Sequence, residues 1–212
     1  ASLAKMGVKV SREVVEKAIS DSINANGPDI GLKVAVDSQK KKILISQTYP
    51  DKPFADIVHQ MLVFNDVPPD DVLYTNCDDE VCRVPEGREV YDYLREFFVE
   101  SYSTQKIFVL FVTSENTKVS WGAITEVGAS WITKVDHKIF NIRPFRPEHP
   151  LNDEVQWQST NRDKAGELSM DPLNADIFCQ KIEAACDALG YKKKPRAKNM
   201  AHLSTLVSVR KS

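Results

Sequence analysis

The six residues Ile107, Phe108, Val109, Leu110, Phe111 and Val112 form the most apolar run of the sequence. A run of this length without polar interruption predicts a strand that is buried on both faces, as in the middle of a parallel sheet. Working outward from it, we expect shorter strands at residues 43–45, 71–75 and 138–142, and an edge strand at residues 155–157.

Amphipathic helices are expected between these strands. One begins near Pro53, because proline is tolerated in a first helical turn, and others cover residues 90–98, 119–133 and 173–189, the last ended by Gly190. Strands that alternate with helices imply right-handed crossovers and a parallel sheet covered on both faces. We therefore expect an α/β domain with a parallel sheet of about five strands.

The two ends of the chain differ in character from this core. Residues 11–24 can form an added N-terminal helix with one apolar stripe, so we divide the chain into an N-terminal helical extension (1–39), a main domain (40–190) and a basic C-terminal tail (191–212). The tail has basic side chains and no acid, and we interpret its lysines as solvated rather than as a nucleic-acid or lipid contact. Its apolar residues are expected to touch the domain or a neighbouring subunit; they are Leu203, Leu206, Val207 and Val209. Deletion of residues 197–212 is expected to have a smaller effect than deletion of residues 1–38.

Composition narrows the class of protein. The chain has 212 residues, of which 42% are hydrophobic and 27% charged, with a net charge of −2, as in ordinary globular proteins. No apolar run approaches the roughly 18–20 residues that span a bilayer, and the start lacks a secretory signal pattern. Four cysteines form no CxxC pair and have no histidine near them in sequence, so we expect free thiols in a cytoplasmic protein and no metal site.

Ligands of parallel sheets bind beyond the carboxyl ends of the strands, so the loops that follow residues 46, 75 and 112 are expected to share one rim. The helix at 119–133 belongs to the same region. Its periodicity predicts a sheet-facing side formed by Ile124, Val127, Gly128, Trp131, Ile132 and Val135. Glu126 then points the opposite way among small residues, either as a solvated glutamate or as a carboxylate lining a cleft. Trp121 is either a stacking surface or a core residue.

Several motifs, in order along residues 40–145, resemble those of TIR (Toll/interleukin-1 receptor-like) domains of the prokaryotic, NAD⁺-cleaving type. Residues 43–55 are similar to the family's opening strand and loop. Residues 67–72, 84–87 and 90–94 resemble its second strand, BB loop and second helix, and residues 114–116, 120 and 126–131 resemble its third helix with the preceding loop. Three features depart from the pattern: Ala123 replaces a frequent cysteine, Trp121 precedes Glu126 by five residues rather than four, and residues 78–83 are acidic where relatives are often glycine-rich.

The resemblance implies a TIR-like, flavodoxin-like fold and an enzyme that breaks the nicotinamide–ribose bond of NAD⁺, releasing nicotinamide and ADP-ribose or a cyclic isomer. Glu126 would be the catalytic group, stabilising an oxocarbenium-like ribose. The resemblance also implies substrate contacts from Ser46, Gln47, Tyr49, Asp51, Arg83, Gly87 and Trp121. Arg83 is the expected phosphate contact, and NAD⁺ is the substrate with no further cofactor.

The same resemblance implies a homo-oligomer built through TIR–TIR contacts, with the loop at 77–87 as a contact loop, and a role in antiviral defence in which a downstream effector reads a nucleotide signal. Two alternatives stay open. One is a non-catalytic TIR adaptor that works by self-association, and the other is an enzyme similar to nucleoside deoxyribosyltransferases, which also place a glutamate beside an N-glycosidic bond.

Overall fold

The computed structural model describes residues 41–100, 106–151 and 157–210. The expected N-terminal helix at 11–24 lies outside these residues, as does most of the edge strand expected at 155–157. Its last residue, Trp157, is not in a strand.

The described chain is an α/β domain with one seven-stranded sheet. Its strands are β1 (Lys41–Ser46), β2 (Val72–Leu73), β3 (Lys106–Thr113), β4 (Asp136–Ile142), β5 (Ser159–Arg162), β6 (Leu168–Met170) and β7 (Ser208–Val209). Its helices are α2 (Lys52–Phe64), α3 (Val90–Glu100), α4 (Trp121–Thr133), α5 (Pro172–Leu189) and α6 (Arg196–Leu206).

The strand order is β2-β1-β3-β4-β5-β6-β7. The first five strands are parallel to their neighbours, β6 is antiparallel to β5, and β7 is parallel to β6. The order 2-1-3-4-5 is that of flavodoxin-like folds, so the expected α/β class and mostly parallel sheet are confirmed. The sheet has two more strands than expected because the chain reverses after β5 and adds an antiparallel edge.

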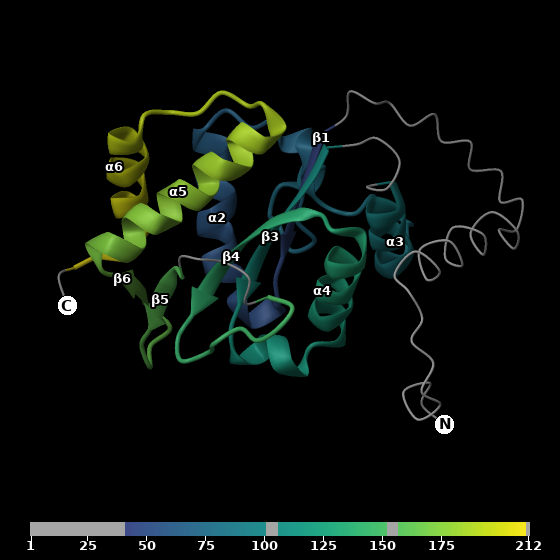
Figure 1. Ribbon diagram of the computed structural model, residues 1–212, viewed down its shortest axis with the longest axis horizontal. Coiled ribbons are helices and arrows are strands. Elements are labelled where there is room, and N and C mark those ends of the chain that lie inside the picture. Colours follow the sequence, from purple (N-terminus) through teal and green to yellow (C-terminus); the bar gives the residue numbers. More distant parts are fainter. Residues whose placement is uncertain (1–40, 101–105, 152–156, 211–212) are drawn as a thin grey trace, which may run out of the picture. The chain divides into compact units, whose positions relative to one another are not determined.

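β3 lies between β1 and β4, and all six residues of its apolar run are buried. Side chains alternate across the sheet, so this strand supplies both of the cores. On one face Phe108, Leu110 and Val112 pack with side chains of α2, α5 and α6, and on the other Val109 and Phe111 pack mainly with α3. Figure 1 shows the corresponding layers, with α2, α5 and α6 on one side of the sheet and α3 and α4 on the other.

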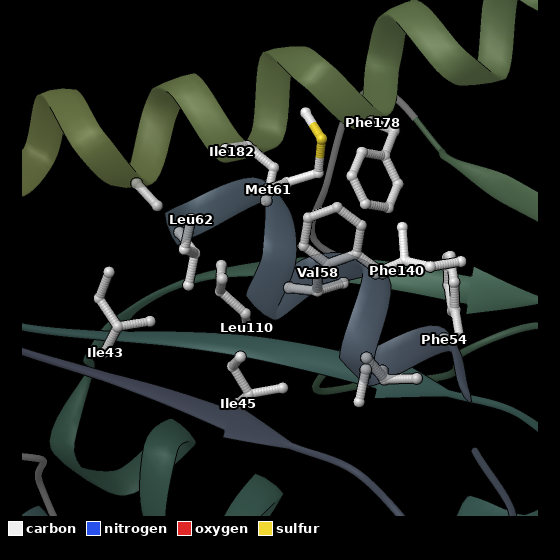
Figure 2. Packing of buried hydrophobic residues seen from close by; sticks show 14 of the residues in the cluster. Ile43, Ile45, Phe54, Val58, Met61, Leu62, Leu110, Phe140, Phe178 and Ile182 are labelled. Atoms are coloured by element: carbon white, nitrogen blue, oxygen red, sulfur yellow. The ribbon is translucent and has the colours of Figure 1, made fainter. Parts of the chain in front are cut away.

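The larger core is centred on three aromatic rings. Phe54 of α2, Phe140 of β4 and Phe178 of α5 have ring centroids 4.6 to 6.4 Å apart, in tilted or edge-on arrangements (Figure 2). Tilted and edge-on contacts are the favoured geometry for aromatic pairs, beyond the area that the rings bury. These contacts fix α2 and α5 against the same face of the sheet.

The helix ends follow from local sequence. The Asp171 side chain accepts a hydrogen bond from the backbone N–H of Asn174 and so caps the start of α5. Gly190 ends the same helix with a φ of 70°, in the left-handed region that favours glycine. Ser120 caps α4 through the backbone N–H of Ala123. The predicted start of α2 at its proline and the predicted end of α5 are therefore confirmed.

The segment expected to be a basic tail forms α6 and β7 and completes the sheet. Leu203 and Asn199 of α6 are fully buried, and the Asn199 amide donates to a carboxylate oxygen of Glu183 on α5 at 2.9 Å. Arg196 donates two hydrogen bonds to the same carboxylate, at 2.7 and 2.8 Å. The structured part of the chain therefore continues beyond residue 190, although Lys192, Lys193 and Lys198 are exposed, as expected for the lysines.

No helix within the described ranges combines the length and the apolar character that crossing a membrane requires.

The burial of α6 predicts that this helix is required for stability. Leu203→Ala should lower the free energy of unfolding by about 2–5 kcal/mol, because it leaves a cavity in the core. Leu173→Ala is the matched control, since Leu173 is 69% exposed and should lose almost nothing. Urea unfolding of the two variants makes the comparison, and equal losses would show that α6 is a passive tail.

Candidate functional site

A buried carboxylate connects the loops at the carboxyl edge of the sheet. Asp51, in the turn before α2, is fully buried. Its Oδ2 accepts hydrogen bonds from the hydroxyls of Thr48 and Ser114, both at 2.6 Å. Its Oδ1 accepts from the amide of Asn116 at 3.1 Å and from Nη1 of Arg162 at 2.9 Å. The carboxylate therefore joins the loops after β1 and β3 to the end of β5, and its four donors give it a positioning role.

Glu126 of α4 lies at the same end of the sheet, next to Ser46 at the end of β1. A hydrogen bond with Ser46 lowers the pKa of the Glu126 carboxyl, but the larger effect of burial raises it to about 7. Within the described part of the chain, Oε2 of Glu126 is buried and makes no hydrogen bond. The Glu126 side chain as a whole is half-buried. A carboxylate with a buried, unsatisfied oxygen and a raised pKa is typical of functional sites, where such groups meet a ligand.

This position of Glu126 corrects the predicted orientation of α4. Val127 and Val135 pack on the sheet-facing core as expected. Ile124, Trp131 and Ile132, which were also expected there, are 45, 59 and 55% exposed. The buried positions of the helix are Ala123 and Ser130.

The physical reason is steric and chemical. The side of α4 that carries Ala123, Glu126 and Ser130 approaches the sheet, and two of these residues are small. Periodicity of apolar residues predicts that the large side chains of α4 face the sheet, and for Ile124, Trp131 and Ile132 this prediction is wrong. Of the two interpretations left open for Glu126, a fully solvated glutamate does not agree with the structure, because the side chain is half-buried and its Oε2 is buried.

Four further buried polar atoms make no hydrogen bond with the described residues. They are both amide atoms of Gln47, Oγ of Ser130 and Nη2 of Arg162. Gln47 follows Ser46 directly, Ser130 lies one helical turn after Glu126, and Arg162 is anchored by Asp51. Unsatisfied buried polar groups are rare and costly in folded proteins. Three of these atoms belong to Gln47 and Arg162, at the carboxyl ends of β1 and β5, which indicates a place for a polar ligand or for bound water at this edge of the sheet.

The other residues predicted for the site lie in more open positions. Tyr49 and Trp121 are 77 and 82% exposed. The Arg83 side chain donates to the backbone carbonyls of its own loop, at Cys77 and, at 3.0 Å, at Asp78. Gly87 is exposed and has a φ of 82°, which explains the glycine by backbone conformation alone. Among the predicted site residues, the described contacts bring together Ser46 and Glu126. Gln47 and Asp51 follow Ser46 closely in the chain, and the other four predicted residues are not joined to them by the described contacts.

Arg162 was not predicted as a site residue. The edge strand was expected at residues 155–157, whereas β5 covers Ser159–Arg162 and so places Arg162 at the end of a strand. A cluster of His59 with Cys77 and Cys82 was not predicted either. Nε2 of His59 is 3.4 Å from Sγ of Cys82 and 4.0 Å from Sγ of Cys77. Burial lowers the pKa of His59 and raises that of the Cys82 thiol to about 12. The histidine precedes the cysteines by 18 and 23 residues, so no short sequence motif signals the cluster.

Comparison of the sequence with models of protein families and with curated proteins gives no match. Inferences about function therefore depend on the geometry of the sheet edge and on the order of the sequence motifs.

The raised pKa of Glu126 predicts that this residue costs stability at neutral and alkaline pH. Below its usual value of 4.5 the carboxyl is protonated in both the folded and the unfolded chain and has no effect. Between 4.5 and about 7 the unfolded chain ionises first, so stability falls as the pH rises. The full penalty, about 3 kcal/mol for this shift, is present above pH 7.

Glu126→Gln removes the titrating group, so this variant should be more stable than the wild type at pH 8, by on the order of 2–3 kcal/mol, and nearly equal to it at pH 4. Urea unfolding at the two pH values measures the difference. Glu115→Gln, at an exposed glutamate paired with Lys118, should show no such gain. A Glu126→Gln variant whose stability relative to the wild type does not change with pH would contradict the burial of the charge.

Proposed function

We propose that this protein is an NAD⁺-cleaving enzyme of the TIR type, an NAD⁺ glycohydrolase or ADP-ribosyl cyclase, with Glu126 as its catalytic carboxylate. The observation that carries the proposal is the position of Glu126, which is half-buried next to the end of β1 and has a buried, unsatisfied Oε2. Ligands of open parallel sheets bind at this edge. The resemblance of several sequence motifs to those of TIR domains implies that the substrate is NAD⁺.

The chemistry needs one well-placed anion. When the bond between the ribose C1′ and the nicotinamide nitrogen breaks, its electron pair leaves with nicotinamide, which departs as a neutral molecule. The ribose is left with oxocarbenium character, and the ionised Glu126 stabilises that positive charge. Electrostatic stabilisation is stronger in a buried site than in water, because solvent screens it less. Water then adds to C1′ to give ADP-ribose, or a nucleophile within the same molecule adds to give a cyclic isomer.

The groups around Glu126 suit a dinucleotide. Gln47 offers both a donor and an acceptor that have no hydrogen-bond partner among the described residues, which suits ribose hydroxyls or the nicotinamide carboxamide. Arg162 has one such buried donor, Nη2, and a guanidinium is a strong partner for phosphate. We therefore assign the phosphate contact to Arg162 rather than to Arg83, whose side chain donates to carbonyls of its own loop.

Glu126→Gln should reduce nicotinamide release by a factor on the order of 10²–10³ or more, because the charge that stabilises the transition state is lost. In the wild type the rate should rise with pH through about 7, as the carboxyl ionises. Glu115→Gln is the matched control and should retain wild-type turnover. The measurement is nicotinamide release from NAD⁺, with the products identified by mass spectrometry.

Near-normal turnover of Glu126→Gln would contradict the assignment of this residue. Exchange of bases on a deoxynucleoside, without cleavage of NAD⁺, would instead favour the enzyme similar to nucleoside deoxyribosyltransferases.

A second candidate function, self-association as a TIR interaction module, is favoured by the outer surface of α4. Five large apolar side chains are exposed there or in the turn before it, namely Val119, Trp121, Ile124, Trp131 and Ile132. Contiguous exposed apolar surface commonly marks interaction sites. A catalytic assembly would use the same surface, with the nucleotide product passed to an effector in antiviral defence.

Trp121→Ser should therefore shift the chain from a homo-oligomer toward the monomer without unfolding it, because this side chain is 82% exposed. Val63→Ser, at an exposed position on α2, should leave the mass unchanged. Light scattering across a dilution series measures both variants beside the wild type. A wild-type monomer at every concentration would exclude self-association, whereas an oligomer that never releases nicotinamide would favour the non-catalytic module.

A further inference from the structure

The cluster of His59, Cys77 and Cys82 has the chemistry of a metal site. His59 lies on α2, and the two cysteines lie in the loop between β2 and α3. One ligand atom from each of the three residues lies within 4.8 Å of those from the others. Both cysteines are buried and unbridged, and the histidine is half-buried. Thiolate sulfur and imidazole nitrogen are the ligands that zinc and other soft divalent metals prefer.

The distances suit a single tetrahedral ion. With zinc bonds of about 2.3 Å to sulfur and about 2.0–2.1 Å to nitrogen, a sulfur and a nitrogen ligand are roughly 3.6 Å apart. Nε2 of His59 lies 3.4 Å from Sγ of Cys82 and 4.0 Å from Sγ of Cys77. The two sulfurs, which a tetrahedral zinc ion holds roughly 3.8 Å apart, lie within 4.8 Å of each other. An ion can therefore bind between the three atoms after small side-chain movements. We propose that His59, Cys77 and Cys82 bind one zinc ion, with water in the fourth position.

The loop that carries the cysteines is already folded in the shape that this site requires. The backbone N–H of Tyr74 donates to the carbonyl of Cys82 at 2.7 Å, and that of Cys77 donates to the carbonyl of Tyr74 at 3.0 Å. The Arg83 side chain donates to the carbonyl of Cys77 and so closes the loop from the other side. Both thiols are thus held against α2 before any ion arrives, which reduces the entropy that binding must overcome.

The surrounding charge also favours a cation. Asp56 and Asp79 act electrostatically on His59, and Asp79 and Asp70 act on Cys82, with Lys52 as the opposing cation. A bound dication would join α2 to the loop at residues 77–87, the loop that the TIR resemblance assigns to contacts between subunits. This inference does not depend on NAD⁺ cleavage, because none of the three ligands belongs to the site around Glu126.

The test uses the full chain, reduced and stripped of metal with a chelator. Wild-type protein should take up roughly one zinc per chain, measured by elemental analysis after dialysis, and should melt at a higher temperature with zinc than without it. With Co²⁺ as the probe, it should show the absorption bands of cobalt–thiolate bonds. Cys82→Ser and His59→Gln should lose at least ~10-fold in zinc affinity. Cys186→Ser, which removes a buried thiol of α5, should bind as the wild type does.

If the variants do not fold, measurements on the wild type still test zinc binding. The proposal predicts cobalt–thiolate absorption bands and a melting temperature that falls on chelation and recovers with zinc. Wild-type protein that retains no zinc, shows no thiolate bands and melts at the same temperature with or without the metal would overturn the proposal. Equal zinc uptake by Cys82→Ser and the wild type would overturn it too. A Cys77–Cys82 disulfide that persists in the native protein would show that the pair serves redox chemistry instead.

Discussion

The hydrogen-bonded carboxylate of Asp51 is the interaction on which the carboxyl edge of the sheet depends. A buried charge is tolerated only where partners satisfy it, and this one has two hydroxyls, an amide and a guanidinium. Those partners come from the loops after β1 and β3 and from the end of β5, so one group fixes the relative positions of three segments far apart in sequence. The edge residues Ser46 and Gln47 lie just before the segment that this network holds, and Glu126 of α4 lies next to Ser46.

The fully hydrogen-bonded carboxylate of Asp51 contrasts with other polar groups that are buried without hydrogen-bond partners among the described residues. Both carboxylate oxygens of Asp51 accept hydrogen bonds. Other side chains keep buried polar atoms that have no partner in the described chain, namely those of Gln47, Glu126, Ser130 and Arg162. A fold selected for stability alone would pair or replace them, and strained or unsatisfied groups persist mainly where function requires them. The same reasoning explains why α4 turns small residues and a glutamate inward while its tryptophans face outward. This orientation leaves Trp121, Ile124, Trp131 and Ile132 exposed and so costs apolar burial.

Sequence patterns predicted the parts of the fold that depend on local signals. The apolar run of β3, the proline at the start of α2 and the glycine after α5 each determine their elements through burial or backbone conformation. The orientation of α4 could not be predicted, because periodicity measures apolarity and not the space beside the sheet. The contact of Leu203 and Val207 with the domain was predicted from their apolarity. The helical form of α6 was not, because polar contacts of Asn199 and Arg196 with Glu183 hold much of it. Glu126 was predicted from the motif, whereas Arg162 and His59 meet their partners only through the tertiary fold.

The central claim is that Glu126 is a buried carboxyl held ready for a ligand, and its own titration tests that claim most directly. Carbon-13 NMR of the carboxyl, assigned with the Glu126→Gln variant, follows its ionisation with and without NAD⁺ or nicotinamide. The account predicts a midpoint near 7 in the free protein, well above the usual range, and a shift of the midpoint when a ligand occupies the site. A midpoint near 4.5 that no ligand moves would show a solvated glutamate and would contradict the account.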